Sequence, residues 1–439
     1  MVRLLTVGIV IGSLLLFPMI QMSAVEAQIA DGAAVKSPDL VPAAAVRAMT
    51  AARMSSAIPA PMPELRADSG SQRSVSRQSV QPQNPDGLLE RIEPQSPGGA
   101  PGGGPFLENT LTLPLSFLSA NVPAGQGFPY YCATTTGGPY ADTPADFVVG
   151  NTTCNLVHPP FTNPTSAARG FSPPYNRSGV FPFSLYNDPL GTVGRFPWIS
   201  HVKIFFTNVG YDPSGGTFVC SGTSINSGIG GNESLVLTAG HCVNSGGDGN
   251  QFGLWSTNVL VCPAWRDGNA PLGCWPGKKL LTLGGWYFLS NLRRDVGMIV
   301  VARDSNTGTV GPLNRVVGAY GLIVNAPRTQ EFWSFGYPAA SPFNGHRLQI
   351  VTSPRSRDDI RLDYYFPGAG PTTMGIGSDL TGGSSGGGWI MRARMGNPGY
   401  ANGLNSYKWV VPREPRMMHG PYFDTSVKNL WNNARVVDP

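Results

Sequence analysis

The chain has 439 residues, a formal net charge of +5 and 41% apolar residues, which is enough for a sizeable core and more length than one compact domain needs. Only 13% of the residues are charged, while 56 are Gly and 41 are Pro, a composition typical of a loop-rich, β-dominated chain with a disordered section. No block of Lys and Arg stands out, so the sequence argues against a nucleic-acid partner.

The N-terminus predicts export. Arg3 precedes an apolar run from Leu4 to Ile20, and small residues follow up to Ala27. A basic, then an apolar, then a small-residue region is the layout of a secretory signal peptide, here residues 1–27 with cleavage after Ala27. The run is short for a membrane span and is interrupted by Pro18. We therefore expect a secreted, extracellular protein with no stable membrane anchor after signal cleavage.

Two regions separate this peptide from the main domain. Residues 28–105 are rich in Ala, Ser, Pro and Gln and end in a Gly/Pro tract, so they bury too little apolar surface to order themselves. We interpret them as a low-complexity pro-segment or linker. Residues 106–195 contain aromatic residues and two cysteines, and we interpret them as a propeptide or an N-terminal extension that folds at least in part.

Residues 196–439 predict an all-β domain closed by one C-terminal helix. Short apolar runs with turn residues between them predict strands over 202–206, 235–238, 296–301, 332–335, 389–391 and 409–411. Near the end, Val427, Leu430, Trp431 and Ala434 recur at the spacing of one helical face. Asp424, Thr425 or Ser426 would cap the start of that helix.

The chain has six cysteines, and an even number in an exported chain indicates disulfides rather than a metal site. No CxxC spacing occurs and the histidines are scattered, so we expect neither a metal nor another cofactor. Pairing in chain order is one of the many arrangements that six cysteines allow, and it gives Cys132–Cys154, Cys220–Cys242 and Cys262–Cys274.

Three local segments carry residues suited to nucleophilic catalysis. His241 follows an apolar strand and is next to Cys242, Asp295 begins a buried-looking strand, and Ser385 lies in the glycine-rich run 381–387. Taken singly, these would be a structural histidine, a turn aspartate and a Gly/Ser linker. However, a strand at Trp389 follows the glycines at once, and a linker would not run straight into a strand.

Together the three residues form a chemically complete set. A serine hydroxyl is a weak nucleophile until a base takes its proton, and a neutral imidazole is such a base near pH 7. A carboxylate on the other imidazole nitrogen fixes the tautomer and stabilises the cation that forms. The sequence therefore predicts His241 as general base, Asp295 as its orienting partner and Ser385 as nucleophile.

These segments resemble the trypsin/chymotrypsin superfamily of serine proteases, most closely its bacterial and fungal branch related to staphylococcal glutamyl endopeptidase. The likeness covers about residues 190–437 and rests on four motifs: Gly240-His241-Cys242, Gly-Tyr-Pro at 336–338, Gly-Gly-Ser-Ser-Gly-Gly at 382–387 and Asn-Gly-Leu-Asn-Ser-Tyr at 402–407. It implies two perpendicular six-stranded antiparallel β-barrels with the active site between them, and a polypeptide substrate. It also implies the Cys220–Cys242 disulfide and an oxyanion hole formed by the backbone N–H groups of Gly383 and Ser385.

The same resemblance suggests the substrate pocket without fixing its preference. Asp379 stands where trypsin-like enzymes bind Arg or Lys, and Ser406, Tyr407 and Lys408 stand along the pocket wall. Lys408 occupies a position that is commonly glycine, where it would neutralise Asp379 or accept an acidic side chain. Asn405 replaces a histidine of the glutamyl enzymes. Basic, glutamyl and apolar preferences therefore all stay open.

Activation and two rival functions complete the expectations. The long region before residue 196 suggests a zymogen cut between Arg169 and Arg195, and we expect a monomer. Because Ser384 replaces the usual aspartate before the nucleophile, activation through a new N-terminal amine is not expected. An α/β-hydrolase esterase orders its triad Ser, Asp, His, but only His419 follows Ser385. A catalytically silent binding protein on a protease scaffold is the other alternative.

Overall fold

The computed structural model describes residues 31–66, 88–95 and 196–439, with the backbone of residues 146–149 and 152–155. Within 196–439 it leaves out 309–310, 329, 331, 342, 354–355, 367, 379, 392–398 and 412–416. The expected signal peptide and the activation region between Arg169 and Arg195 therefore lie outside the described residues. No helix among those that are described is long and apolar enough to cross a membrane.

The first half of the main domain is a closed six-stranded antiparallel barrel. Its strands are β7 (His201–Thr207), β8 (Thr217–Ser224), β9 (Leu235–Thr238), β10 (Thr257–Pro263), β11 (Trp275–Leu283) and β12 (Gly297–Val301). They pair in the order β11-β10-β7-β8-β9-β12, and β12 pairs with β11 to close the ring. Phe205, Leu237, Val261, Leu280 and Ile299 are fully buried, so the barrel has a packed apolar interior.

The second half is built from two smaller sheets. One has the strand order β15 (Gln349–Ser353), β14 (Phe332–Gly336), β18 (Gly388–Met391), β19 (Tyr400–Leu404), β13 (Gly321–Val324) and β4 (Glu90–Ile92). The other has the order β16 (Arg357–Asp358), β17 (Met374–Gly377) and β21 (Met417–Gly420). All the named pairs are antiparallel except β13 with β19.

Among the described residues, the second half does not form the six-stranded barrel that we expected. Its strands do not form one closed ring of hydrogen bonds. A closed ring would need these strands to pair with one another, but two of their edges pair with segments from before residue 196: β13 pairs with β4, and β20 (Lys408–Val411) pairs with β3 (Glu64–Arg66).

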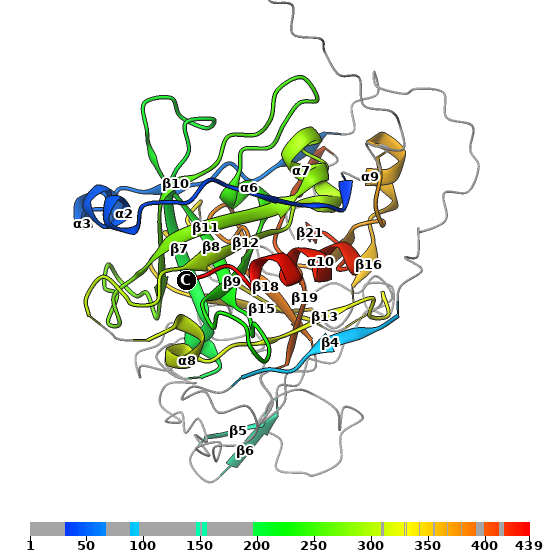
Figure 1. Cartoon of the computed structure of the whole chain (residues 1–439). Coiled ribbons are helices and arrows are strands. Elements are labelled where there is room, and N and C mark those ends of the chain that lie inside the picture. Colours follow the sequence, from blue (N-terminus) through cyan, green and yellow to red (C-terminus); the bar gives the residue numbers. More distant parts are fainter. Residues whose placement is uncertain are drawn as a thin grey trace, which may run out of the picture.

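Residues 31–66 are ordered by contact with the main domain rather than by a core of their own. The segment contains β1 (Ala34–Lys36), α2 (Pro42–Ala48), α3 (Ala51–Ser55), β2 (Ile58–Pro59) and β3. Strand β1 pairs with β11, β2 with β8 and β3 with β20, while Ala45, Met49 and Ala60 are buried. Figure 1 shows the blue N-terminal segments lying along the green barrel.

The short apolar runs form strands as expected. All six predicted strands match β7, β9, β12, β14, β18 and β20 to within one residue at each end. The C-terminal helix is also confirmed: α10 (Thr425–Ala434) buries Val427, Leu430, Trp431 and Ala434. Its cap is Asp424, which accepts a hydrogen bond from the Ser426 N–H, and the helix lies against β11 and β12 (Figure 1).

The remaining elements are short connections. They are η3 (Trp198–Ser200), α6 (Gly240–Val243), α7 (Gly284–Leu289), η4 (Leu292–Arg294), α8 (Leu313–Val317), α9 (Ile360–Tyr365) and the antiparallel pair β5 (Asp146–Val149) and β6 (Thr152–Asn155). Two of them adjoin residues singled out in the sequence: α6 follows β9 and carries His241, and η4 precedes Asp295 and β12.

Candidate active site

His241 lies on α6, one turn of helix that begins where β9 ends. Its ring Nδ1 is 2.8 Å from Asp295 Oδ2, and its backbone N–H donates to Asp295 Oδ1 at 2.7 Å. The Tyr211 hydroxyl donates to the His241 carbonyl at 2.6 Å. Both the ring and the backbone of His241 are thus held, so the free ring nitrogen, Nε2, has a fixed direction.

Asp295 follows η4 and is fully buried. It accepts a third hydrogen bond, at 2.5 Å, from the Ser406 hydroxyl to Oδ2. A buried carboxylate needs such partners, because an uncompensated one is strongly disfavoured away from water. These contacts explain how a buried aspartate can stand just before strand β12. They also show that Ser406 lies at the site.

Ser385 lies in a tight turn that is fixed to the first barrel. Its carbonyl accepts from the Ser221 N–H of β8 at 2.8 Å, and the Ser221 hydroxyl donates to the Gly383 carbonyl at 2.8 Å. Glycine is required at 386, where φ is +81° and an added Cβ would lie 2.1 Å from Thr238 Oγ1. The glycines of this run therefore serve close packing and are not a flexible linker.

Asn405 holds the same turn from the other side. Its side-chain amide donates to the carbonyls of Ser384 and Phe335 at 3.0 and 2.9 Å. Its Oδ1 accepts from Trp389 Nε1 and from the Ser334 hydroxyl, both at 2.8 Å. From the sequence Asn405 was expected only as a substituted pocket residue, whereas in the structure it positions the serine turn.

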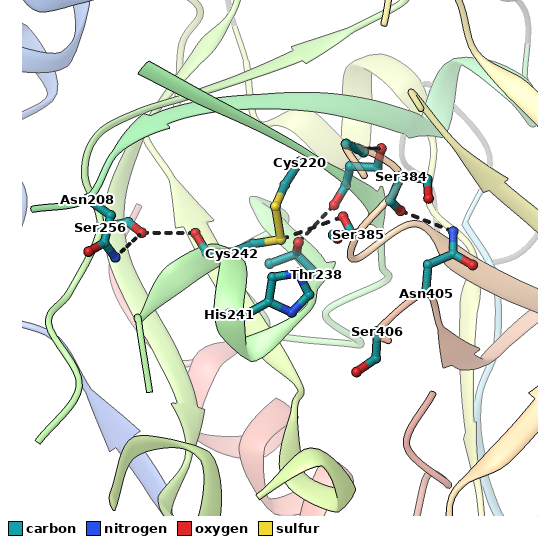
Figure 2. The surroundings of a disulfide bond; sticks show 12 residues. Asn208, Cys220, Thr238, His241, Cys242, Ser256, Ser384, Ser385, Asn405 and Ser406 are labelled. Atoms are coloured by element: carbon teal, nitrogen blue, oxygen red, sulfur yellow. Dashed lines mark hydrogen bonds between the residues drawn. A yellow bond between two sulfur atoms is a disulfide. The ribbon is translucent and has the colours of Figure 1, made fainter. Parts of the chain in front are cut away.

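Two of the three expected disulfides lie within the described residues. Cys220 and Cys242 are joined, with a sequence separation of 22, and so are Cys262 and Cys274, with a separation of 12. The first ties β8 to the residue after His241, and Figure 2 shows it beside His241 and Ser385. The expected Cys132–Cys154 pair lies outside the residues whose side chains are described.

Two polar atoms at this convergence are buried and make no hydrogen bond within the described part of the chain: His241 Nε2 and Ser385 Oγ. The relative exposure of His241 is 1% and that of Ser385 is 0%. Buried polar groups are normally satisfied, so each exception calls for an explanation, and these two lie on residues that the sequence singles out for catalysis. The hydrogen bond between the two, which proton transfer requires, is not formed here.

Nearby backbone amides offer a site for a negative oxygen. Gly383 has φ of +94°, and an added Cβ would lie 2.7 Å from the Tyr337 carbonyl. Among the hydrogen bonds of the described residues, none has the backbone N–H of Gly383 or Ser385 as donor. Donors in a glycine turn that leave their capacity unused are suited to stabilising developing charge on a carbonyl oxygen.

The expected pocket residues are only partly assembled. Asp379 lies outside the described residues, so the proposed pairing with Lys408 is not tested. Lys408 Nζ approaches the Ser378 carbonyl at 3.4 Å. Tyr407 is fully buried, and its hydroxyl donates to Asp359 Oδ2 at 2.8 Å. In this structure its side chain is therefore part of the interior and is not exposed for contact with a substrate.

A buried polar cluster that the sequence does not predict lies next to Tyr407. Asp359 accepts from Trp409 Nε1 at 2.7 Å and lies 3.7 Å from His419 Nε2, and the His419 ring stacks on Tyr407. Burial opposes the charge of Asp359, but His419 and the hydrogen bonds from Trp409 and Tyr407 outweigh it and lower its pKa. No sequence motif marks Asp359, because its partners come from β20 and β21.

The residues of the site do not suit a metal ion. One group of potential ligands lies close together among the described residues, namely Cys220, His241 and Cys242. Its two sulfur atoms are bonded to each other, and a disulfide offers no thiolate.

The chain was compared with protein families, curated proteins and solved structures, and only the solved structures are similar to it. Neither the family models nor the curated proteins that were compared include a match. Among solved structures, the chain is 37% identical to the protease Anisep from Arthrobacter nicotinovorans, covering 54% of this chain and 96% of that one, with a TM-score of 0.45.

Two further solved structures are similar. A thermostable serine protease, AL20, from an extremophilic microorganism is 31% identical, with coverage of 54% and 98% and a TM-score of 0.46. A Glu endopeptidase is 15% identical, with coverage of 56% and 94% and a TM-score of 0.39. Because the first two identities extend over nearly the whole of both proteases, this chain belongs to the chymotrypsin-fold serine proteases.

Proposed function

We propose that this protein is a secreted serine endopeptidase, made as a zymogen, that cleaves polypeptides through an acyl-enzyme on Ser385. The observation that carries the proposal is the set of three hydrogen bonds to Asp295, two from His241 and one from Ser406. These bonds fix the orientation of the imidazole. Its Nε2 and the Ser385 Oγ make no hydrogen bond within the described residues. Neither atom has a structural role that would explain its burial.

The reaction follows from this arrangement. His241 Nε2 takes the proton of Ser385 Oγ as that oxygen attacks the carbonyl carbon of the scissile bond. The backbone N–H groups of Gly383 and Ser385 donate to the oxyanion, and Asp295 stabilises the imidazolium. His241 then gives its proton to the leaving amine. Water repeats the sequence on the acyl-enzyme and frees Ser385.

The organisation of the chain supports export and activation by cleavage. We propose a signal peptide over residues 1–27, a pro-region that extends to residue 195 and a protease domain over 196–439. The two disulfides of the described residues fit an oxidising compartment. N-terminal sequencing of the secreted protein tests this division, and a mature chain that begins before Cys132 would contradict a propeptide over 106–195.

The decisive experiment compares the wild type with Ser385→Ala on a diverse peptide library, after removal of the region before residue 196. We expect cleavage by the wild type only, and the cut sites distinguish basic, glutamyl and apolar preferences. Labelling by a serine-directed phosphonate, lost in the variant, is the parallel readout. If neither protein cuts nor labels, the alternative of a catalytically silent binding protein replaces this proposal.

A further inference from the structure

Residues 58–66 join the two halves of the protease domain across the candidate site. At one end, Ile58 and Pro59 pair with Phe218 and Val219 of β8, and the Ala60 N–H donates to the Val219 carbonyl at 3.0 Å. At the other end, the Lys408 N–H donates to the Pro63 carbonyl at 3.1 Å, and Glu64 and Leu65 pair with Lys408 and Trp409 of β20. Strand β8 continues to Ser221, whose N–H donates to the Ser385 carbonyl, and β20 begins two residues after Ser406.

The side chains between these ends fill the same region. Pro59 lies 3.1 Å from the position of a Cβ on Gly382, next to the proposed oxyanion hole. Met62 packs against the apolar cluster that includes Leu380 and Met418, and Leu65 packs against the cluster of Trp286, Tyr407 and Trp409. Ala60 is only 1% exposed. The segment thus occupies the region in which a substrate would bind. This position agrees with the burial of Ser385 and His241.

The segment runs in the opposite direction to that expected of a bound substrate. In the proposed reaction the acyl half of a substrate lies along Ser406–Lys408, where the side chain before the scissile bond enters the pocket. The leaving half then continues past Ser385 towards β8, whose Ser221 N–H donates to the Ser385 carbonyl at 2.8 Å. A substrate therefore runs from β20 to β8, whereas this segment runs from β8 to β20 and pairs in parallel with both strands.

We propose that residues 58–66 occupy the substrate cleft in the reverse direction and keep the protease latent. Reversal exchanges the positions of the carbonyl and the leaving nitrogen relative to Ser385 and His241, so the segment blocks the cleft without being cut. This inference rests on the peptidase function proposed above.

The latent state would outlast a first cut in the chain. Cleavage between Arg169 and Arg195 leaves residues 31–66 held by the β1–β11, β2–β8 and β3–β20 pairings. Before that cut the chain tethers the segment at an effective concentration of the order of millimolar. After the cut, these pairings and the buried side chains of Ala45, Met49 and Ala60 hold it. Activation therefore needs a second step, in which this segment dissociates or is degraded.

The test measures how fast a fluorophosphonate labels Ser385 in the uncut, full-length chain. Ala60→Arg introduces a large side chain at a buried position, and Leu65→Asp places a charge against Trp409. We expect both to speed labelling by about tenfold or more over the wild type. Ala52→Arg is the matched control, because Ala52 is exposed on α3 of the same segment, and it should label at the wild-type rate.

Met62→Ala provides a variant that removes packing without a new clash, and intact mass with both disulfides formed verifies folding. We expect a smaller acceleration than with Ala60→Arg. Equal labelling rates in the wild type and in all three cleft variants would overturn autoinhibition while leaving the peptidase function in place. No labelling in any form, including chains freed of the region before residue 196, would instead overturn both proposals.

Discussion

Asp295 shows how one side chain organises the candidate site at the scale of the residue. It binds the ring of His241, the backbone of His241 and the Ser406 hydroxyl at the same time. The sequence allowed a prediction that Asp295 orients His241, because an aspartate at the head of a buried strand needs a partner. It gave no sign that Ser406, which we expected in the pocket, would be that aspartate's other partner.

Asp295→Asn should therefore be far more damaging than Ser406→Ala. An amide at 295 reverses the hydrogen bond to Nδ1 and favours the wrong tautomer of His241, for which we expect a loss in kcat of about 10³- to 10⁴-fold. Removal of the Ser406 hydroxyl leaves both His241 contacts intact and should cost about tenfold. Steady-state kinetics on a cleaved peptide substrate measures both. Equal losses would show that orientation by Asp295 depends on Ser406.

Lys203 is a buried residue outside the site whose protonation should control stability. Its Nζ donates to the Gly345 carbonyl at 2.8 Å and lies 4.8 and 4.9 Å from the ring centres of Phe205 and Trp265. Burial lowers the pKa of Lys203 to about 7, from an ordinary value of 10.5. The unfolded chain thus binds this proton at pH values where the folded chain has released it.

Stability should accordingly rise as the pH increases from about 7 towards 10.5, by up to about 1.4 kcal/mol per pH unit from this group. Below pH 7 both states are protonated and the slope from Lys203 disappears. Lys203→Met keeps an unbranched apolar stem beside the two rings and removes the titration. Urea unfolding at pH 7 and pH 9 should show a flatter dependence in the variant. The same slope in both proteins would mean that Lys203 stays charged in the folded state.

Among the elements, the turn after β9 depends on a covalent link as well as on hydrogen bonds. Cys220–Cys242 and Cys262–Cys274 have sequence separations of 22 and 12. Because loop-closure entropy grows only with the logarithm of loop length, removing either by a double Ala substitution should cost about 3 kcal/mol of unfolding free energy. Only the first adjoins His241. We expect a loss of activity in the Cys220/Cys242 variant and near-normal activity in the folded Cys262/Cys274 variant. Calorimetry and peptide cleavage on the same samples provide the comparison, and equal losses of activity would contradict the positioning role.

Element prediction succeeded where the signal is local. Apolar runs bounded by turns gave the strands, and the spacing of Val427, Leu430 and Trp431 gave α10, because these patterns report one buried face. Sheet closure is not local. The pairing of β3 with β20 brings together residues that are hundreds of positions apart, and nothing in Glu64–Arg66 marks it as a strand that needs a partner.

For the whole molecule, the N-terminal region is where sequence reasoning fell furthest short. Its composition indicates a segment that cannot fold alone, and in the structure residues 31–66 indeed have no core of their own. What composition does not reveal is that a chain without its own core is ordered by the open edges of another domain. His241, Asp295 and Ser385 could be proposed from the sequence because residue type carries their chemistry, whereas the pairing of residues 58–66 with β8 and β20 could not.

Arg294 links this region to the rest of the molecule through a buried ion cluster. It donates to Asp31 at 2.5 Å and to Asp424, the cap of α10, at 2.8 Å. Burial works against the charge of Arg294, but Asp424 and Asp31 together raise its pKa. Removing the cation leaves two carboxylates facing each other without compensation, whereas removing one carboxylate leaves a balanced pair.

Arg294→Gln should therefore lower the unfolding free energy by about 3–5 kcal/mol, and Asp31→Asn by about 2 kcal/mol. The two variants should also differ in retention of the N-terminal fragment after a cut between Arg169 and Arg195. Asp31→Asn weakens only the docked segment, so its fragment should leave the protease during gel filtration more readily than that of the wild type. Denaturant titration gives the first quantity and the composition of the eluted peak gives the second. If Asp31→Asn destabilises the protein as much as Arg294→Gln yet the fragment stays bound, the segment is a permanent part of the fold and not a removable cover.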